Sequence, residues 1–258
     1  MQEQSPSHRV AVVTGGAMGI GAEVCKRLVS ADFIVIIADR DKTAAERFGA
    51  QLTAAGHRVE ALMVDVGEAA SVAQGFAEVQ RRHGRCDVLV NCAGIAKVYP
   101  FLEFPLENFA ATMNVNVTGT LLCAQHAARL MMTNRWGRIG NIASVAGLRV
   151  VGTGRTAYGT SKAAVIALTR QMAVELAEHG ITANAVSPGP VDTPMTRVLH
   201  TDKFRKEYTD AIPMGRYGST SEVANAVMYF VGEEAAYTTG VVLPVDGGFL
   251  ASGAREIR

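Results

Sequence analysis

The sequence lacks the features that mark a metal site or a disulfide framework. It has four cysteines in 258 residues. They stand at positions 25, 86, 92 and 123 without C-x-x-C spacing, so neither a zinc site nor a set of disulfides is indicated. The six histidines form no H-x-x-x-H or H-E-x-x-H pattern. We therefore expect buried, reduced thiols and no catalytic metal.

An excess of charge of one sign is also missing. The chain has 25 basic and 24 acidic residues, a net charge of +1, and no basic block or charged tail. This balance argues against nucleic acid or an anionic membrane as the main partner. No apolar run approaches the roughly 18 residues that cross a bilayer, and the polar tail over residues 1–9 has no apolar signal-peptide core. We expect a cytoplasmic protein with a small-molecule ligand.

The chain does contain short apolar runs that alternate with longer segments of helical period. The runs predict buried parallel strands at 10–13, 34–37, 61–64, 88–90, 139–142, 183–186 and 241–245. Apolar residues three and four positions apart predict helices over 43–55, 69–83, 109–134 and 157–178. No linker or repeat divides the chain. We predict one α/β domain over residues 1–258, a Rossmann-like, doubly wound parallel sheet in three α/β/α layers.

A glycine-rich turn joins the first predicted strand to a helix. Thr14 is followed by G-G-A-M-G-I-G, a G-x-x-x-G-x-G spacing rather than the commoner G-x-G-x-x-G. Glycines here allow a sharp turn and the close approach of a pyrophosphate, which then lies at the positive N-terminus of the helix. The candidate cofactor-binding residues in this turn are Gly15, Met18, Gly19, Ile20 and Gly21.

Asp39 ends the second predicted strand, 18 residues after Gly21. An acidic residue near this distance binds the adenosine ribose hydroxyls, and a carboxylate repels the 2′-phosphate of NADP. Arg40 complicates this prediction, because a guanidinium can pair with that phosphate. The alternative for Asp39 is that it only caps the following helix. We expect NAD as the cofactor, with NADP less favoured.

Further candidate cofactor residues follow the third and fourth predicted strands, where ligands of open parallel sheets bind. They are Asp65, Val66, Asn91, Ala93 and Gly94. Taken singly, Asp and Asn-x-x-Gly can serve only to close turns. Taken in series, they predict the lining of one cofactor site.

Tyr158 and Lys162 lie four residues apart in a predicted helix and therefore on one face. A nearby ammonium favours the phenolate. A lowered pKa is what a phenol, with an ordinary pKa of about 10, needs for proton transfer near neutrality. The pair is thus an acid/base candidate, and two surface residues of a helix are the alternative.

In order and interval, these motifs resemble the short-chain dehydrogenase/reductase family. The matching positions are 14–21, 65–66, 91–94, Asn116 in N-V-N-V-T-G, Ser144 in N-I-A-S, Tyr158 with Lys162, and 187–189 with Thr193. The resemblance runs from Val10 to the D-G-G turn at 246–248. Cys92 departs from the family pattern, which more often has a second asparagine there.

The resemblance implies an NAD(P)-dependent alcohol dehydrogenase or ketone reductase. It makes Tyr158 the general acid/base, Ser144 the group that positions the substrate oxygen, and Lys162 a contact of the nicotinamide ribose that lowers the pKa of Tyr158. Asn116 would hold a water that links Lys162 to solvent. Ser144 and Tyr158 are thus the residues expected to bind the substrate. The resemblance adds Tyr158, Lys162, Pro188, Gly189, Val191 and Thr193 to the cofactor site.

Each of these residues also has a structural alternative. Ser144 can be a turn hydroxyl at a strand end, and Asn116 an interior amide bonded to backbone. Lys162 can be a solvated lysine on a helix. Taken together, these alternatives require four coincidences along the chain.

The residues are compatible with three functions. The first is an NAD-dependent dehydrogenase of a secondary alcohol, polyol or sugar, which Asp39 favours. The second is a 3-oxoacyl-thioester reductase that uses NADPH and offers Arg129 or Arg135 to an acidic acyl carrier protein; Asp39 counts against it. The third is a nucleotide-binding regulator without chemistry, which the intact catalytic set disfavours. We expect the first.

Residues 188–219 form the least regular segment, with four prolines, and we expect a substrate-covering loop region there. The pocket beneath it is predicted to be mostly apolar, formed by Ile95, Ala96, Val145, Ala146, Val150, Val151, Met195, Val198 and Leu199. Lys97, Arg149 and Arg155 are candidates to bind a carboxylate, phosphate or sugar hydroxyl at its rim. The family resemblance also implies a homotetramer, with contacts through the helix over 157–178 and the tail over 247–257.

Overall fold

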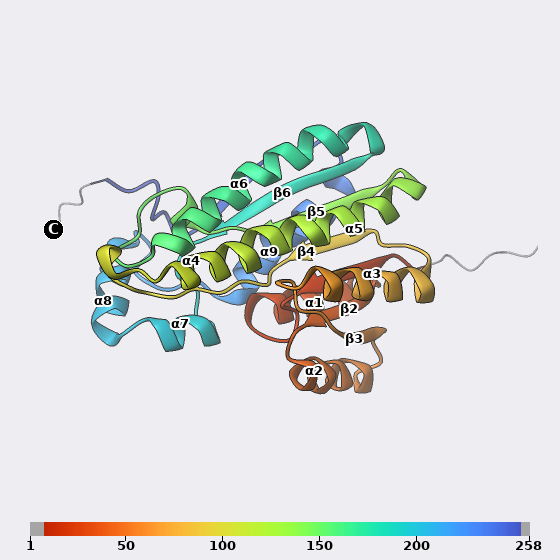
Figure 1. The fold of residues 1–258 in the computed structure, drawn as a ribbon, viewed down its shortest axis with the longest axis horizontal. Coiled ribbons are helices and arrows are strands. Elements are labelled where there is room, and N and C mark those ends of the chain that lie inside the picture. Colours follow the sequence, from red (N-terminus) through yellow and green to blue (C-terminus); the bar gives the residue numbers. More distant parts are fainter. Residues whose placement is uncertain (1–7, 254–258) are drawn as a thin grey trace, which may run out of the picture.

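A computed structural model describes residues 8–253, and its strands within that range form one seven-stranded parallel sheet (Figure 1). The strand order is β3-β2-β1-β4-β5-β6-β7. The strands are β1 (Val10–Thr14), β2 (Ile34–Asp39), β3 (Val59–Met63), β4 (Val88–Asn91), β5 (Gly137–Ile142), β6 (Ile181–Pro188) and β7 (Val242–Val245). All neighbouring pairs are parallel. Each predicted strand is present, and the predicted α/β fold class is confirmed.

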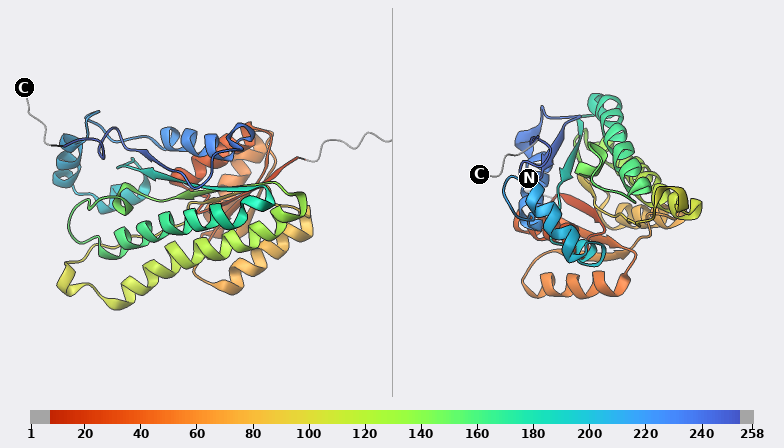
Figure 2. Two further views of the ribbon diagram at one scale, coloured as in Figure 1. Left: turned by 90° about the horizontal axis from the view of Figure 1, so that it is seen from above. Right: turned by 90° about the vertical axis from the view of Figure 1, so that its left-hand side faces the viewer.

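Helices cover both faces of the sheet. They are α1 (Gly19–Ser30), α2 (Lys42–Ala54), α3 (Ala69–His83), α4 (Leu106–Met113), α5 (Gly119–Asn134), α6 (Thr156–Leu176), α7 (Pro194–Leu199), α8 (Asp202–Ala211) and α9 (Thr220–Val231). In Figure 2, α3, α4, α5 and α6 lie on one side of the sheet, and α1 and α9 lie on the other. The protein therefore has the expected three layers. No helix in the described part of the chain is long and apolar enough to cross a membrane.

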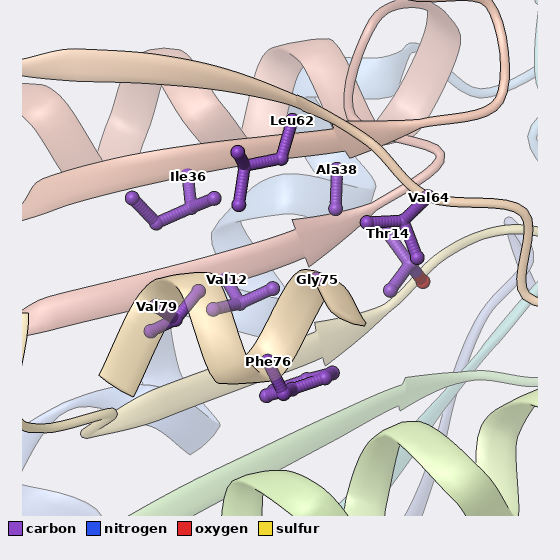
Figure 3. A pocket seen from close by; sticks show the side chains of 9 residues that line it. All are labelled: Val12, Thr14, Ile36, Ala38, Leu62, Val64, Gly75, Phe76 and Val79. Carbon is purple, nitrogen blue, oxygen red and sulfur yellow. The ribbon is translucent and has the colours of Figure 1, made fainter. Parts of the chain in front are cut away.

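Both faces of β1 are buried, which explains its uninterrupted apolar sequence. Val10 and Val12 contribute to the core cluster under α3 and α5, whereas Ala11 and Val13 contribute to the cluster under α1 and α9. A strand covered on both faces needs apolar residues at every position rather than at alternate ones. The α3 side contains a void of about 10 Å³ lined by residues such as Val12 and Phe76 (Figure 3), which is too small for a ligand.

The single helix predicted over 109–134 is interrupted. The structure has α4, then a π-helical turn over Asn114–Thr118, then α5. A π turn widens the helix by one residue and is frequent at functional sites. Because apolar periodicity continues through the turn, the sequence pattern did not reveal it. The turn directs Asn116 into the protein, where this residue is 1% exposed.

Residues 188–219 are more regular than predicted, since they contain α7 and α8. Thr193 caps α7 in a reciprocal capping box with Thr196, and Thr201 caps α8. Pro194 stands in the first turn of α7, where proline is favoured rather than disruptive. Both helices lie together at one end of the molecule (Figure 1). Of the predicted tails, residues 1–7 and 254–258 lie outside the described residues.

Candidate active site

The strand order reverses between β1 and β4, since β2 and β3 lie on one side of β1 and β4 lies on the other. Ligands of doubly wound sheets bind at such a switch point. Gly15, just after β1, has a φ of +62°, and a Cβ on it would lie 2.9 Å from the backbone nitrogen of Ala93. The Thr14 hydroxyl accepts hydrogen bonds from the backbone N–H of Cys92 at 3.2 Å and of Ala93 at 3.3 Å. These contacts fix the floor of a cleft.

The cleft has a volume of about 680 Å³ and brings together most of the residues predicted from sequence. The predicted cofactor and catalytic residues that line it are Gly15, Met18, Gly19, Ile20, Asp39, Arg40, Asp65, Val66, Ala93, Gly94, Ser144, Tyr158, Lys162, Pro188, Gly189, Val191 and Thr193. They come from the carboxyl ends of six strands and from α1 and α6. One cleft therefore joins the glycine-rich turn to the tyrosine and lysine pair.

Three predicted residues lie behind the lining. A Cβ on Gly21 would lie 2.2 Å from the Gly15 carbonyl oxygen, so Gly21 permits the tight turn. The Asn91 amide donates to Asn141 Oδ1 at 2.9 Å in the interior. Asn116 is the third and is described below. The geometry gives all three a supporting position around the cleft.

The N-terminus of α1 has no side-chain cap. Met18 occupies the N-cap position without a capping hydrogen bond, and the first turn of α1 contains no acidic residue. By contrast, Asp41 caps α2 and Ser219 caps α9. The backbone N–H groups at the start of α1 and the positive helix end fit a phosphate group. This donor set is what a dinucleotide pyrophosphate requires.

Asp39 is 8% exposed and is held by two backbone amides. Its Oδ2 accepts from Ala17 N at 3.1 Å, and its Oδ1 accepts from Asp41 N at 3.1 Å. The N-cap of α2 is Asp41, which accepts from Ala44 N at 2.9 Å. The alternative that Asp39 merely caps this helix is therefore wrong. The carboxylate of Asp39 instead lines the cleft beside the glycine-rich turn.

Ser144, Tyr158 and Lys162 line the other half of the cleft. Ser144 follows β5, and its hydroxyl accepts from Ala146 N at 3.1 Å. Tyr158 lies in the first turn of α6. Lys162 lies one turn later, is 5% exposed, and donates from Nζ to the Ile142 carbonyl at 2.7 Å. Lys162 is thus a buried residue and not the solvated helix lysine of the alternative.

The expected effect of Lys162 on the pKa of Tyr158 is not found in the protein alone. Burial raises the pKa of Tyr158, while a hydrogen bond with Ser144 and the charge of Arg155 oppose the rise. Lys162 Nζ lies 5.7 Å from the centre of the phenol ring, and burial lowers the pKa of Lys162 to about 8. Burial therefore outweighs the charges near the phenol, and the lower pKa expected with the oxidised cofactor bound stays a prediction.

Asn116 uses its whole side chain in protein contacts. Its Oδ1 accepts from Ile95 N at 2.8 Å, and its Nδ2 donates to Ile95 O at 3.0 Å and to Ser161 Oγ at 2.9 Å. The side chain therefore matches the structural alternative, an interior amide bonded to backbone. It clamps the segment over 94–97, which lines the cleft. The predicted water-holding role stays a prediction.

The predicted substrate pocket is only partly assembled in the cleft. Ile95, Ala96, Lys97, Met195, Val198 and Leu199 line it. Val145 and Val151 instead join a buried cluster with Tyr208, Ile212 and Phe249, because the loop that follows Ser144 folds under α8.

Sequence reasoning missed the Ile142 carbonyl, which holds Lys162, because a backbone acceptor has no sequence signature. Cys92 also lines the cleft, and burial raises the pKa of its thiol to about 11. Among residues 8–253, no group of three or more His, Cys, Asp or Glu side chains could hold a metal ion.

Comparison with known proteins agrees with this geometry. A family model described as "Enoyl-(Acyl carrier protein) reductase" matches residues 15–250. The chain is 38% identical over 244 residues to a 3-oxoacyl-acyl-carrier-protein reductase of Aquifex aeolicus (strain VF5), covering 93% of this chain and 96% of the relative. It is 36% identical over 241 residues to the corresponding reductase of Mycobacterium avium, covering 93% and 89%.

A solved structure is also similar. A gluconate 5-dehydrogenase from Burkholderia cenocepacia J2315, in complex with NADP and tartrate, has a TM-score of 0.90 and 31% identity, covering 95% of this chain and 96% of that one. The fold and the cleft define a nucleotide-binding oxidoreductase of the Rossmann type. The chain belongs to the short-chain dehydrogenase/reductase family, whose members use NAD(P).

Proposed function

We propose that the protein is an NAD-dependent dehydrogenase of a secondary alcohol, polyol, sugar or other hydroxy compound, and of the matching ketone in reverse. One observation carries the proposal: a single cleft has Ser144, Tyr158 and Lys162 in one half and Asp39 in the other. The first half is suited to proton transfer and the second to a ribose. Asp39 would then hold the adenosine ribose of a dinucleotide, and Tyr158 with Lys162 would hold its nicotinamide end.

The residues of the catalytic half have separate roles in alcohol oxidation. A bound nicotinamide supplies the hydride chemistry. As the phenolate, Tyr158 accepts the proton of the substrate hydroxyl, and as the neutral phenol it donates a proton to the ketone oxygen in the reverse direction. The Ser144 hydroxyl donates a hydrogen bond to the substrate oxygen. The Lys162 ammonium, fixed on the Ile142 carbonyl, stabilises negative charge on that half of the cleft.

The preference for NAD rests on three consecutive residues. Asp39, Arg40 and Asp41 all line the cleft, so two carboxylates flank one guanidinium and the local charge is negative. Such a site accepts hydrogen bonds from ribose hydroxyls and repels a phosphate. The Burkholderia dehydrogenase bound to NADP makes NADP the comparison to run beside NAD.

The second candidate is a 3-oxoacyl-thioester reductase that uses NADPH. The identity to the Aquifex reductase favours it. Of the two basic residues expected to meet a carrier protein, Arg135 already has a partner in the chain. Arg135 follows the last residue of α5 and donates to Glu178 O at 2.7 Å, so it lies at the end of α5 opposite the Asn116 turn.

We also propose that the protein is a homotetramer and that it is located in the cytoplasm. Phe101, Leu102 and Leu106 are apolar side chains on and before α4, and Leu102 is 95% exposed. An exposed apolar group of this kind favours contact between subunits. Light scattering of the purified protein tests the tetramer, and a monomeric mass would refute it.

The test of function is NADH absorbance with a panel of polyols, sugars, secondary alcohols and 3-hydroxyacyl thioesters, with NADP run in parallel. Turnover with NAD on one alcohol class supports the proposal, whereas turnover only with NADP on thioesters supports the second candidate. Tyr158→Phe should lose turnover by about 100- to 10,000-fold and still bind NADH. Tyr237→Phe, at a fully exposed tyrosine, is the matched control and should be unchanged.

A further inference from the structure

Charged residues divide the cleft into two electrostatically different halves. The half that follows β2 and β3 contains Asp39, Arg40, Asp41 and Asp65, three acids and one base. In the catalytic half, the charged lining residues within the described chain are Lys97 and Lys162. A substrate beside Tyr158 therefore meets positive charge and no carboxylate of the cleft wall.

Lys97 has an uncompensated charge. It lies in the loop after β4, is exposed, and lines the cleft. Among residues 8–253 it has no ion pair or side-chain hydrogen bond. Lys162 differs because it is buried and bonded to the Ile142 carbonyl. Lys97 is therefore the cation of this half that is free to contact a ligand.

Arg155 is a second cation without a carboxylate partner in the described structure. It precedes α6, three residues before Tyr158, and is half-buried. Its Nη2 donates to His200 Nε2 at 2.9 Å, and its guanidinium carbon lies 5.0 Å from the centre of the Phe204 ring. Its remaining N–H groups have no hydrogen-bond partner among the described residues. By contrast, Arg197 in α7 and Arg205 in α8 both form ion pairs with Asp192.

His200 holds Arg155 without neutralising it. A guanidinium can only donate, so His200 Nε2 must be the acceptor and the ring must be neutral. The other ring nitrogen, Nδ1, then donates to the Tyr217 hydroxyl at 2.9 Å. Burial and two nearby arginines lower the pKa of His200 to about 4, so the ring stays neutral at ordinary pH. The full positive charge of Arg155 thus remains beside the catalytic half.

The segments that carry the two cations are joined. The backbone N–H of Tyr99, two residues after Lys97, donates to the Gly154 carbonyl at 3.1 Å. A Cβ on Gly154 would meet a Val98 methyl carbon at 2.7 Å, so the two segments pack closely. The loop segments that contain Lys97 and Arg155 therefore lie side by side. Arg155 does not itself line the cleft, but its charge acts on Tyr158.

We propose that the substrate bears an anionic oxygen group, a carboxylate or a phosphate, that binds to Lys97 with Arg155 as the supporting cation. His200 is a positioning residue for Arg155. The wall around this group is apolar, formed by Ile95, Ala96, Met195, Val198 and Leu199. The substrate class is then a hydroxy acid or hydroxy phosphate with an apolar body rather than a neutral polyol. This inference rests on the proposed dehydrogenase function.

The experiment compares matched substrates. Purified protein with NAD, and separately with NADP, is offered secondary hydroxy acids of four to eight carbons, their primary amides and the corresponding hydroxy phosphates. The acid or the phosphate should exceed the neutral amide in kcat/KM by about tenfold or more, the effect of one charge-assisted hydrogen bond. The carboxylate and phosphate arms show which anion is used.

Substitutions then test which residues bind the anionic group of the substrate. Lys97→Met should lower kcat/KM for the anion by about tenfold, mostly through KM, and leave the amide unchanged. Arg155→Met should act in the same direction. Lys203→Met, at an exposed lysine of α8 that does not line the cleft, is the matched control and should leave both substrates unchanged.

Equal kcat/KM for anion and amide in the unmodified enzyme would overturn the proposal. So would an equal loss for both substrates in Lys97→Met. If no alcohol is turned over, the dehydrogenase function fails, and calorimetry still decides the charge preference. Tighter binding of the oxo acid than of its amide to the NADH complex, abolished in Lys97→Met, would support an anion site; equal binding would refute it.

Discussion

Replacing Asn116 by alanine should destabilise the whole protein and loosen one wall of the cleft. The substitution removes the acceptor for Ile95 N and the donor to Ile95 O, which are bonded at 2.8 and 3.0 Å. It also removes the donor to Ser161 Oγ at 2.9 Å. Ser161 keeps its own bond to the Tyr158 carbonyl, so the main loss falls on the two backbone groups of Ile95.

The magnitude follows from these groups. Each buried polar group left without a partner costs about 1 to 3 kcal/mol. Ile95 is half-buried, so water relieves part of the cost and a total of about 2 to 4 kcal/mol is expected. For a chain of this size, that corresponds to a fall in Tm of about 5 to 12 °C. Turnover should fall as well, because the clamped segment lines the cleft.

Thermal unfolding followed by circular dichroism measures the effect. Asn114→Ala is the matched control, since Asn114 lies in the same π turn and makes one exposed hydrogen bond, to Gly67 O at 2.8 Å. Its Tm should change by about 2 °C or less. A fall in Tm for Asn116→Ala no larger than for the control would refute the clamp. Lost turnover with an unchanged Tm would instead favour the water-holding role.

Three further predictions follow from buried groups of the site. The pKa of Lys162 is lowered from 10.5 to about 8, so between these pH values the unfolded chain holds a proton that the folded protein has released. The free energy of unfolding, measured by urea titration, should therefore rise with pH across this window relative to Lys162→Met, by up to about 3 kcal/mol; parallel curves would contradict this. Asp39→Asn should lower the ratio of kcat/KM for NAD over NADP at least about tenfold, and an unchanged ratio would remove Asp39 from cofactor selection. Gly21→Ala should cost about 1 to 3 kcal/mol and weaken NADH binding in a fluorescence titration, since its Cβ would overlap the Gly15 carbonyl; tight binding would show that the turn can relax.

The sequence determined the sheet and most of the cofactor cleft. Strands buried on both faces favour apolar residues at every position, so runs such as Val10–Thr14 and Ile34–Asp39 were visible as a pattern. The glycine-rich turn was visible because only glycine allows the approach of Gly15 to Ala93. Spacing along α6 likewise placed Tyr158 and Lys162 on one face.

Tertiary structure decided the properties that depend on residues far apart in the chain. Burial outweighs nearby charge at Tyr158, and no local pattern reports how deeply a side chain is buried. The bonds of Asn116 to Ile95 and Ser161 join segments 21 and 45 residues away. The neutral state of His200 depends on its burial and on Arg155, 45 residues earlier in the chain. Sequence periodicity describes one element at a time, whereas electrostatics and hydrogen bonding depend on which elements the fold brings together.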